Sequence, residues 1–416
     1  MLNMEIYHIA VILIVLAASF GYINARFLKL PLTIGLMVVS ILFSVGLMIA
    51  GVIDDRLLAL EMEFVEQIAF DELLLEVMLS FLLFAGALHV DFRQLKAQRW
   101  PILLFATIGV MISTVLIGLL SYGLLSILGL NVALIHCMLF GALISPTDPI
   151  AVLGILKKAG VAAELEAKIA GESLFNDGVG VVIFLTLYDF ASGEASLTGP
   201  SDIALLFVHE VGGGILLGLA LGAAAYALMR RIHQFEVELL ISLALVMGGY
   251  QIATILHLSG PLAVVITGLM ISHEQFQTRS FTTEARAHLF QFWELLDVLL
   301  NAILFVLIGL EVVILVLEAD YIIAGLLVIP LVLLARFIAV SLPIKALERR
   351  LAFVPKTPLI MTWGGLRGGI SIALALALTD EMSRELFLTM SYIVVFFSIV
   401  AQGLTLERLV RWVRAA

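Results

Sequence analysis

The stretch ISPTDPIAVL, residues 144–153, interrupts an otherwise apolar segment. Pro146 and Pro149 have no amide hydrogen, so each removes one backbone donor that a continuous helix would use. Irregular backbone at membrane depth is tolerated only where protein or a water-filled cavity covers it. Thr147 and Asp148 lie inside the break. A kink capped by Asp148 would explain the prolines, but a buried carboxylate favours a functional site.

A second apolar segment is interrupted by WGGLRGGIS, residues 363–371. Its four glycines weaken a helix and allow another backbone to approach closely. Arg367 lies among them, and a guanidinium keeps its charge at any depth. We therefore expect Arg367 to meet carboxylates or the carbonyls at a helix C-terminus.

The composition around these breaks is that of a membrane protein. The chain of 416 residues is 62% hydrophobic and 13% charged, whereas an ordinary soluble domain is about 45–50% apolar and about 25% charged. We predict an all-α polytopic membrane protein. The single cysteine, Cys137, excludes a disulfide framework and a cysteine-based metal site. The first apolar segment has no basic region before it and no cleavage site, so we interpret it as a retained span.

Thirteen apolar stretches are long enough for a hydrocarbon core of ~30 Å. They cover residues 6–24, 32–51, 72–90, 101–127, 132–156, 168–190, 203–229, 236–256, 260–273, 291–316, 321–344, 357–379 and 386–407. We therefore predict thirteen transmembrane helices.

Charges in the connecting loops predict the orientation. Every second loop is basic, and the alternate loops are mainly acidic. The basic loops carry Arg26, Lys29, Arg93, Lys96, Arg99, Lys157, Lys158, Lys168, Arg230, Arg231, Arg279, Arg286, Lys345, Arg349, Arg350 and Lys356. We expect a multi-pass protein of the cell's inner (plasma) membrane. The positive-inside rule then places its N-terminus outside the cell and its C-terminus in the cytoplasm. We interpret these basic residues as determinants of membrane orientation, rather than as binding sites for lipids or for a partner protein.

The two interrupted spans are the fifth and the twelfth of this series. Being seven helices apart, they run through the membrane in opposite directions. Each is also the fifth member of a six-helix unit, spans 1–6 and spans 8–13, with span 7 as connector. This is the pattern of two inverted-topology repeats whose crossed, interrupted helices form the substrate site.

A third polar stretch, ESLFNDGVG at residues 172–180, lies in the sixth span. A charged side chain at the bilayer centre costs at least ~2.5–3.5 kcal/mol, so it needs a function or a partner. Ser173 and Asp177 share one helix face with Asn176 beside them. Their carboxylate, amide and hydroxyl oxygens suit a hard monovalent cation. Glu172 lies about 140° round the helix from Asp177, and we predict that it forms a structural ion pair with Arg367.

Burial also predicts a mechanism for Asp177. An unpaired charge is unstable in an apolar environment, so the carboxylate is best neutralised by a proton or by a cation. Alternate occupancy of one carboxylate by either ion is an exchange cycle.

Five motifs in this order resemble the monovalent cation/proton antiporters of the NhaP and eukaryotic sodium/proton exchanger type. They are SPTDP, GESLFNDGVG, HLSGPLAVVITGL, FWELLDVLLNAILFVLIGLE and WGGLRGG. The resemblance implies a thirteen-helix homodimer that exchanges Na⁺ for H⁺. It implies that Asp177 binds both ions, with Asn176, Ser173, Thr147 and Asp148 close by and Na⁺ held by Asp177, Ser173 and Thr147. It also implies Glu172 and Arg367 as the structural pair.

The resemblance implies a division into a dimerisation domain and a mobile core. Helices 1–3 (residues 1–98), connector helix 7 and helices 8–10 (residues 203–316) would form the dimerisation part. Helices 4–6 (residues 99–191) and 11–13 (residues 321–416) would form the core. An asparagine at residue 176 favours electroneutral one-for-one exchange. Ala85 departs from the pattern, because several relatives carry a glutamate there that lines the ion path.

Three further polar residues within predicted spans, Asn301, Glu311 and Arg336, are candidates for lining the ion funnel or supporting the site. For Asn301, Glu311 and the nearby Asp297 we favour a structural role over a functional one. No cofactor is expected, only the transported Na⁺ and H⁺, with Li⁺ or K⁺ as other substrates. The expected partners are small monovalent cations, membrane lipid and a second copy of the chain, with no nucleic acid. The alternatives are K⁺/H⁺ antiport on the same fold and a proton-uncoupled cation channel. We do not expect an enzyme. The enzyme class that we considered is the intramembrane aspartyl proteases, which also need two aspartates on neighbouring helices.

Overall fold

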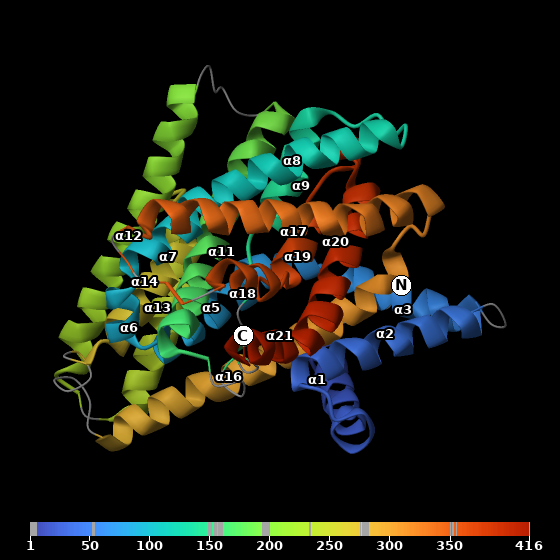
Figure 1. Cartoon of the computed structure of the whole chain (residues 1–416). Coiled ribbons are helices and arrows are strands. Elements are labelled where there is room, and N and C mark those ends of the chain that lie inside the picture. The colour runs from blue at the N-terminus through green and yellow to red at the C-terminus, as the bar shows by residue number, and fades with distance from the viewer. Residues whose placement is uncertain are drawn as a thin grey trace.

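The computed structural model describes residues 6–51, 55–148, 152, 153, 156, 161–193, 200–232, 234–274, 276, 283–349, 351, 353, 354 and 356–415. Within these ranges the chain is helical and has no strand (Figure 1). Five residues that the sequence analysis used, Pro149, Lys157, Lys158, Arg279 and Arg350, lie outside the described residues.

Most of the helices follow the apolar stretches of the sequence. Their bounds are α1 Ile6–Ile23, α2 Leu32–Gly51, α3 Asp55–Ile68, α5 Leu79–His89, α6 Phe92–Ala97, α7 Arg99–Leu104, α8 Val110–Ile127, α9 Leu134–Ile144, α11 Ala163–Ser192, α12 Pro200–Met229, α13 Phe235–Ile255, α14 Gly260–Ser272, α16 Thr283–Leu310, α17 Ala319–Leu347, α18 Thr357–Trp363, α19 Gly369–Leu376, α20 Arg384–Phe397 and α21 Gly403–Ala415. Shorter turns connect several of them: α4 Phe70–Glu72 and the π-helical η2 Leu73–Met78 before α5, and the 3₁₀ turn η4 Glu311–Ile314 after α16.

Nine helices in the described part of the chain are long and apolar enough to cross a membrane. Two shorter apolar helices, α9 and α14, accompany them. Each of the thirteen predicted stretches falls on one or more of the observed helices. The predicted all-helical membrane fold is thus confirmed, whereas the count of thirteen crossings and the inverted repeat stay predictions.

Both predicted helix breaks are present. Helix α9 ends at Ile144, and residues 146–148 have no regular structure. Helix α18 ends at Trp363, and α19 begins only at Gly369. The helices α11, α18 and α19 lie in the middle of the molecule (Figure 1).

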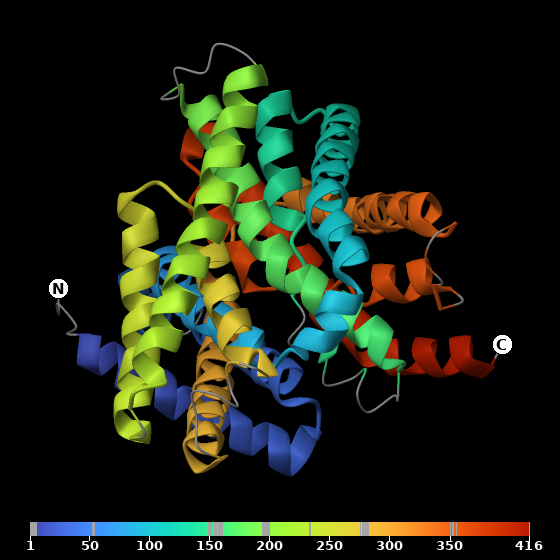
Figure 2. The same ribbon diagram turned by 90° about the vertical axis from the view of Figure 1, so that its left-hand side faces the viewer.

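The helices pack as two groups. In the first group α2 packs on α16, α5 packs on α14 and α16, and α12 and α13 pack on α14. In the second group α8 packs on α9 and α17, α20 packs on α17 and α19, and α11 packs on α9. Figure 2 shows the first group mainly on the left and the second mainly on the right. Helix α11 also contacts α12 and α14, so it lies where the two groups meet.

Candidate ion-binding site

The two helix breaks contact each other through their backbones. The N–H of Asp148 donates to the carbonyl of Leu366 over 2.8 Å. The Nη1 of Arg367 donates to the carbonyls of Ser145 and Pro146, over 2.9 Å for the latter. The guanidinium therefore satisfies carbonyls that have no helical donor beyond the end of α9. Each break thus supplies hydrogen-bonding groups to the other, although the two are far apart in the sequence.

Two glycines allow this close approach. A Cβ at Gly368 would lie 2.5 Å from Oδ2 of Asp148. A Cβ at Gly180 on α11 would overlap Cγ of Pro146. Real Cβ atoms do not come this close to their neighbours, so both positions need glycine to accommodate the first break.

Helix α11 holds the first break with two polar side chains, Ser173 and Asn176, which both contact Thr147. The Oγ of Ser173 donates to the carbonyl of Thr147 and lies 3.1 Å from its Oγ1. The Nδ2 of Asn176 donates to Oγ1 of Thr147 over 2.8 Å, and the N–H of Thr147 donates to Oδ1 of Asn176 over 3.4 Å. All three residues are buried. The predicted ligands Thr147, Ser173 and Asn176 thus form one hydrogen-bonded cluster.

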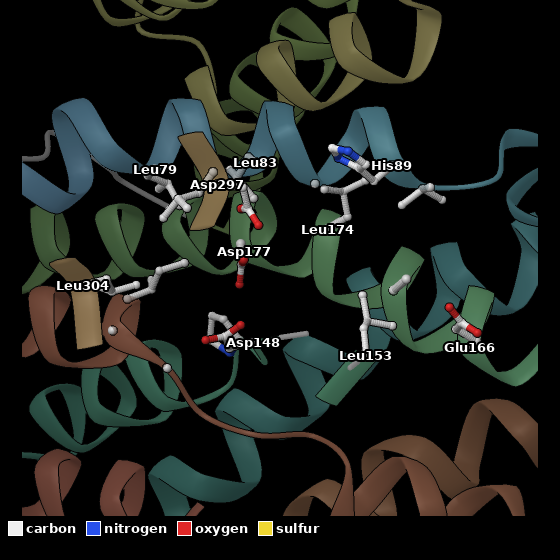
Figure 3. A pocket seen from close by; sticks show the side chains of 18 of the residues that line it. Leu79, Leu83, His89, Asp148, Leu153, Glu166, Leu174, Asp177, Asp297 and Leu304 are labelled. Carbon is white, nitrogen blue, oxygen red and sulfur yellow. The ribbon is translucent and has the colours of Figure 1, made fainter. Parts of the chain in front are cut away.

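Asp177 directly follows Asn176 on α11 and lies in the wall of a cavity of about 630 Å³. The side chain of Asp177 is only 6% exposed. Figure 3 shows it pointing toward Asp148, which also lines the cavity. The cavity lies between the two groups of helices, and exposed residues such as Asp91 and Glu294 form its mouth. A small cation can therefore reach a buried carboxylate pair from one end of the molecule.

The other end of the cavity is closed by apolar side chains. Figure 3 shows Leu79 and Leu304 on the side of Asp177 away from Glu166 and His89. These leucines also line the cavity. An ion at Asp177 is thus open to one end of the molecule only.

The ion pair of Glu172 differs from the predicted one. Glu172 pairs with Arg336 of α17 over 2.5 Å, and not with Arg367. Arg367 instead makes the carbonyl contacts at the end of α9. The helical position of Glu172 predicted only that it points away from Asp177, and the packing of α17 decides which arginine it meets. Arg336, expected only in a funnel or support role, is the partner.

Asn301 and Glu311 do not line the cavity. Asn301 of α16 donates from Nδ2 to the carbonyl of Asp297 over 2.8 Å and to its Oδ1 over 3.0 Å. Glu311 is buried in η4, and its Oε2 has no hydrogen-bond partner among the described residues.

Several residues on the cavity wall were not predicted as site residues, among them Asp297 and His89. The signal that marks Asp297 in the sequence is its charge within an apolar span, four residues before the amide Asn301. His89 ends α5 and carries no such signal, because a histidine at the end of a span is usually solvated.

Comparison with known proteins identifies relatives over nearly the whole chain. The family described as "Sodium/hydrogen exchanger, transmembrane" matches residues 14–412. The Na⁺/H⁺ antiporter NhaP of Pseudomonas aeruginosa is 43% identical over 408 residues, which cover 97% of this chain and 96% of that protein. The Na⁺/H⁺ antiporter NhaH of Halobacillus dabanensis is 34% identical over 404 residues, with 96% of each chain covered.

A solved structure shares the fold. The sodium proton antiporter MjNhaP1 from Methanocaldococcus jannaschii at pH 8 superposes with a TM-score of 0.73. The match covers 99% of this chain and 97% of the other, at 21% sequence identity. At that identity the likeness concerns the arrangement of helices.

Proposed function

The chain belongs to the sodium/hydrogen exchanger family, a family of membrane transporters rather than enzymes, and we propose that it exchanges Na⁺ for H⁺ across the membrane with Asp177 as the shared binding group. The observation that carries this proposal is the buried carboxylate of Asp177, which faces Asp148 at the inner end of an open cavity where two interrupted helices meet. Relatives named as Na⁺/H⁺ antiporters support the choice of ions.

Na⁺ binds between the carboxylate of Asp177 and the hydroxyls of Ser173 and Thr147, with Asp148 close by. The cluster of Thr147, Ser173 and Asn176 supports this assignment, because the hydroxyl of Ser173 lies one helical turn from Asp177 and the cluster fixes the hydroxyl of Thr147 beside it. Asn176 orients Thr147 and adds no charge, so Asp177 trades one cation for one proton and the exchange is electroneutral.

Alternating access moves a core against a dimerisation domain. We assign residues 99–191 and 321–416 to the core, and residues 1–98 and 203–316 to the dimerisation domain of a homodimer. The packing of the helices in two groups, with the cavity between them, supports this division. The mouth of the cavity lies beside the basic segment that includes Arg93 and Lys96, so this conformation faces the cytoplasm.

The end opposite the mouth is held closed by hydrogen bonds between the two parts. The hydroxyl of Tyr392 on α20 donates to the carbonyl of Ile308 on α16 over 2.5 Å. The hydroxyl of Thr389 donates to the carbonyl of Val316 over 3.2 Å. Both bonds join the core to the dimerisation domain, so both break when the transporter opens outward.

Transport by reconstituted protein tests this proposal. Na⁺ or K⁺ is added to proteoliposomes with an acid-loaded lumen, and lumenal pH is followed with the membrane potential clamped by a potassium-independent route. Wild type is compared with Asp177→Asn, and with Glu164→Gln, which removes an exposed carboxylate from the same helix.

Voltage-insensitive alkalinisation driven by Na⁺, kept in Glu164→Gln and absent in folded Asp177→Asn, is the expected result. Alkalinisation with K⁺ but not with Na⁺ would identify K⁺ as the exchanged cation and leave the mechanism as proposed. Cation flux without proton movement would replace antiport by a channel, and exchange retained in Asp177→Asn would overturn the mechanism.

A further inference from the structure

The cavity has a second charged wall that faces Asp177. The first wall consists of α11 and the two helix breaks, and carries Asp148 and Asp177. The opposite wall consists of α5 and α16, and carries His89, Glu294 and Asp297. Nothing in the mechanism above uses the polar groups of this second wall.

Asp297 is the member of this wall that lies deepest. Figure 3 shows its carboxylate above Asp177, next to Leu83, whereas His89 lies further toward Glu166. Glu294, one turn earlier on α16, is exposed at the mouth, and Asp297 is half-buried. A cation that enters past Glu294 therefore meets Asp297 before Asp177.

The carboxylate of Asp297 is held in place from one side. Asn301 donates to its Oδ1 over 3.0 Å and to its main-chain carbonyl over 2.8 Å. No other hydrogen bond to this carboxylate is present among the described residues. One amide thus fixes the orientation of the group, and its second oxygen is left for a ligand.

The imidazole of His89 lies on the same wall of the cavity as Asp297. Its Nδ1 lies 2.7 Å from the carbonyl of Ala85, and its ring packs edge-on against Phe290. A backbone carbonyl can only accept, so Nδ1–H of His89 is the donor in the contact with Ala85. Among the described residues, His89 and Asp297 form no ion pair.

From this geometry we propose that Asp297 is a second cation-binding station, on the dimerisation-domain wall, that loads Asp177 from the cytoplasm. The inference rests on the proposed function, since it deepens the ion path of the same antiporter. A carboxylate in a cavity lined by leucines attracts a monovalent cation more strongly than one in water. Asn301 is a positioning residue, because it contacts Asp297 and not the cavity.

The two stations belong to parts that move relative to each other. When the core moves, Asp177 carries its cation away, and Asp297 stays on the dimerisation domain. Asp297 therefore takes part in loading but not in translocation. Removal of the Asp297 carboxylate is therefore expected to weaken the apparent Na⁺ affinity and to leave the maximal rate of exchange unchanged.

Initial rates of exchange against Na⁺ concentration, at fixed pH and ionic strength, test the proposal. We expect Asp297→Asn to raise the KM for Na⁺ at least fivefold with a maximal rate within twofold of wild type. Asp297→Glu is expected to recover most of the affinity. Glu284→Gln on the same helix removes an exposed carboxylate outside the cavity and serves as the matched control.

Asn301→Ala separates orientation from charge, because it keeps the carboxylate and removes its donor. We expect an intermediate rise in KM. Glu294→Gln measures simple attraction at the mouth, whose effect falls as ionic strength rises; the effect of Asp297→Asn is expected to persist at high ionic strength.

An unchanged KM in folded Asp297→Asn would overturn the second station while leaving the role of Asp177 intact. If Asp297→Asn lost both its maximal rate and its thermal stability, Asp297 would have a structural role instead of a cation-binding role. Failure of the proposed function itself is a different result, exchange that survives Asp177→Asn.

Discussion

Glu172 of α11 and Arg336 of α17 form an ion pair in which neither side chain is more than 4% exposed. The pair joins two helices of the proposed core beside the break that Arg367 stabilises. Arg336 also lies against Gly365, where a Cβ would be 2.8 Å from its Nε. Helices α11, α17 and the second break are therefore tied together at one point, which favours movement of the core as a unit.

Removal of one partner should destabilise the protein more than removal of both. Glu172→Gln leaves the guanidinium of Arg336 buried without a counter-charge, which costs about 3–5 kcal/mol. In the double variant Glu172→Gln/Arg336→Gln no charge is stranded, so part of the loss is expected to return. Thermal unfolding in detergent measures both. Wild-type stability in the single variant would contradict the assignment.

Gly368→Ala should abolish most transport without unfolding the protein. The added methyl group meets Oδ2 of Asp148 and displaces it from the site. We expect the initial exchange rate to fall at least tenfold. Gly123→Ala on α8 is the matched control, since a Cβ there has nothing within 4 Å. Equal rates for the two variants would show that Asp148 tolerates displacement.

Tyr392→Phe should favour the outward-facing state. It removes the hydrogen bond from α20 to Ile308 that we propose closes the outer end, and a bond of this kind contributes about 0.5–1.5 kcal/mol. Apparent Na⁺ affinity from the outer side, measured in oriented vesicles, is expected to rise by up to about tenfold as the competent state becomes more populated. Tyr250→Phe loses a similar bond, to Leu75 within the dimerisation domain, and should leave this affinity unchanged.

Proton and cation should compete for Asp177. If one carboxylate binds either ion, a falling pH raises the apparent KM for Na⁺ by up to about tenfold per pH unit, while saturating Na⁺ restores the rate. Exchange rates over a matrix of pH and Na⁺ concentration measure this. A maximal rate that falls with pH at constant KM would place the proton on another group.

Glu61 should make the fold less stable as the pH rises. It lies on α3, outside the candidate spans, where Oε1 accepts a hydrogen bond from Ser44 over 2.5 Å and Oε2 has no partner among the described residues. Burial raises the pKa of Glu61 above its ordinary value of 4.5, although the hydrogen bond from Ser44 opposes this. The protonated folded state is therefore favoured at low pH.

The resulting stability is present below pH 4.5 and is lost as the pH rises through the folded-state pKa of Glu61. Glu61→Gln removes this dependence, so the variant is expected to be more stable than wild type at pH 8 and similar to it at pH 5. Thermal unfolding at the two pH values compares them. A variant less stable at pH 8 would show that the charged carboxylate has a partner.

Much of the fold follows from local features of the sequence. Pro146 and the glycines around Arg367 act on their own backbone, so the positions of both breaks are readable without tertiary information. Helical periodicity likewise places Ser173 and Asn176 near Asp177, and the structure joins the first two to Thr147.

The remaining features depend on how helices from distant segments pack. Periodicity shows that Glu172 points away from Asp177, but two buried arginines are available to it, and only the placement of α17 selects Arg336. In the same way, Asp297 becomes a cavity residue because α16 lies opposite α11. A charge pattern along one span gives no information about the helix across the cavity.

The contact between Arg367 and the end of α9 has a consequence for biogenesis. The guanidinium and the carbonyl of Ser145 that it satisfies are separated by 222 residues in the chain. A ribosome therefore releases the first break into the membrane long before its donor has been synthesised. Until then the carbonyls of Ser145 and Pro146 need water, lipid headgroups or the insertion machinery as temporary partners. The proposed ion-binding site is thus among the last parts of the molecule to mature.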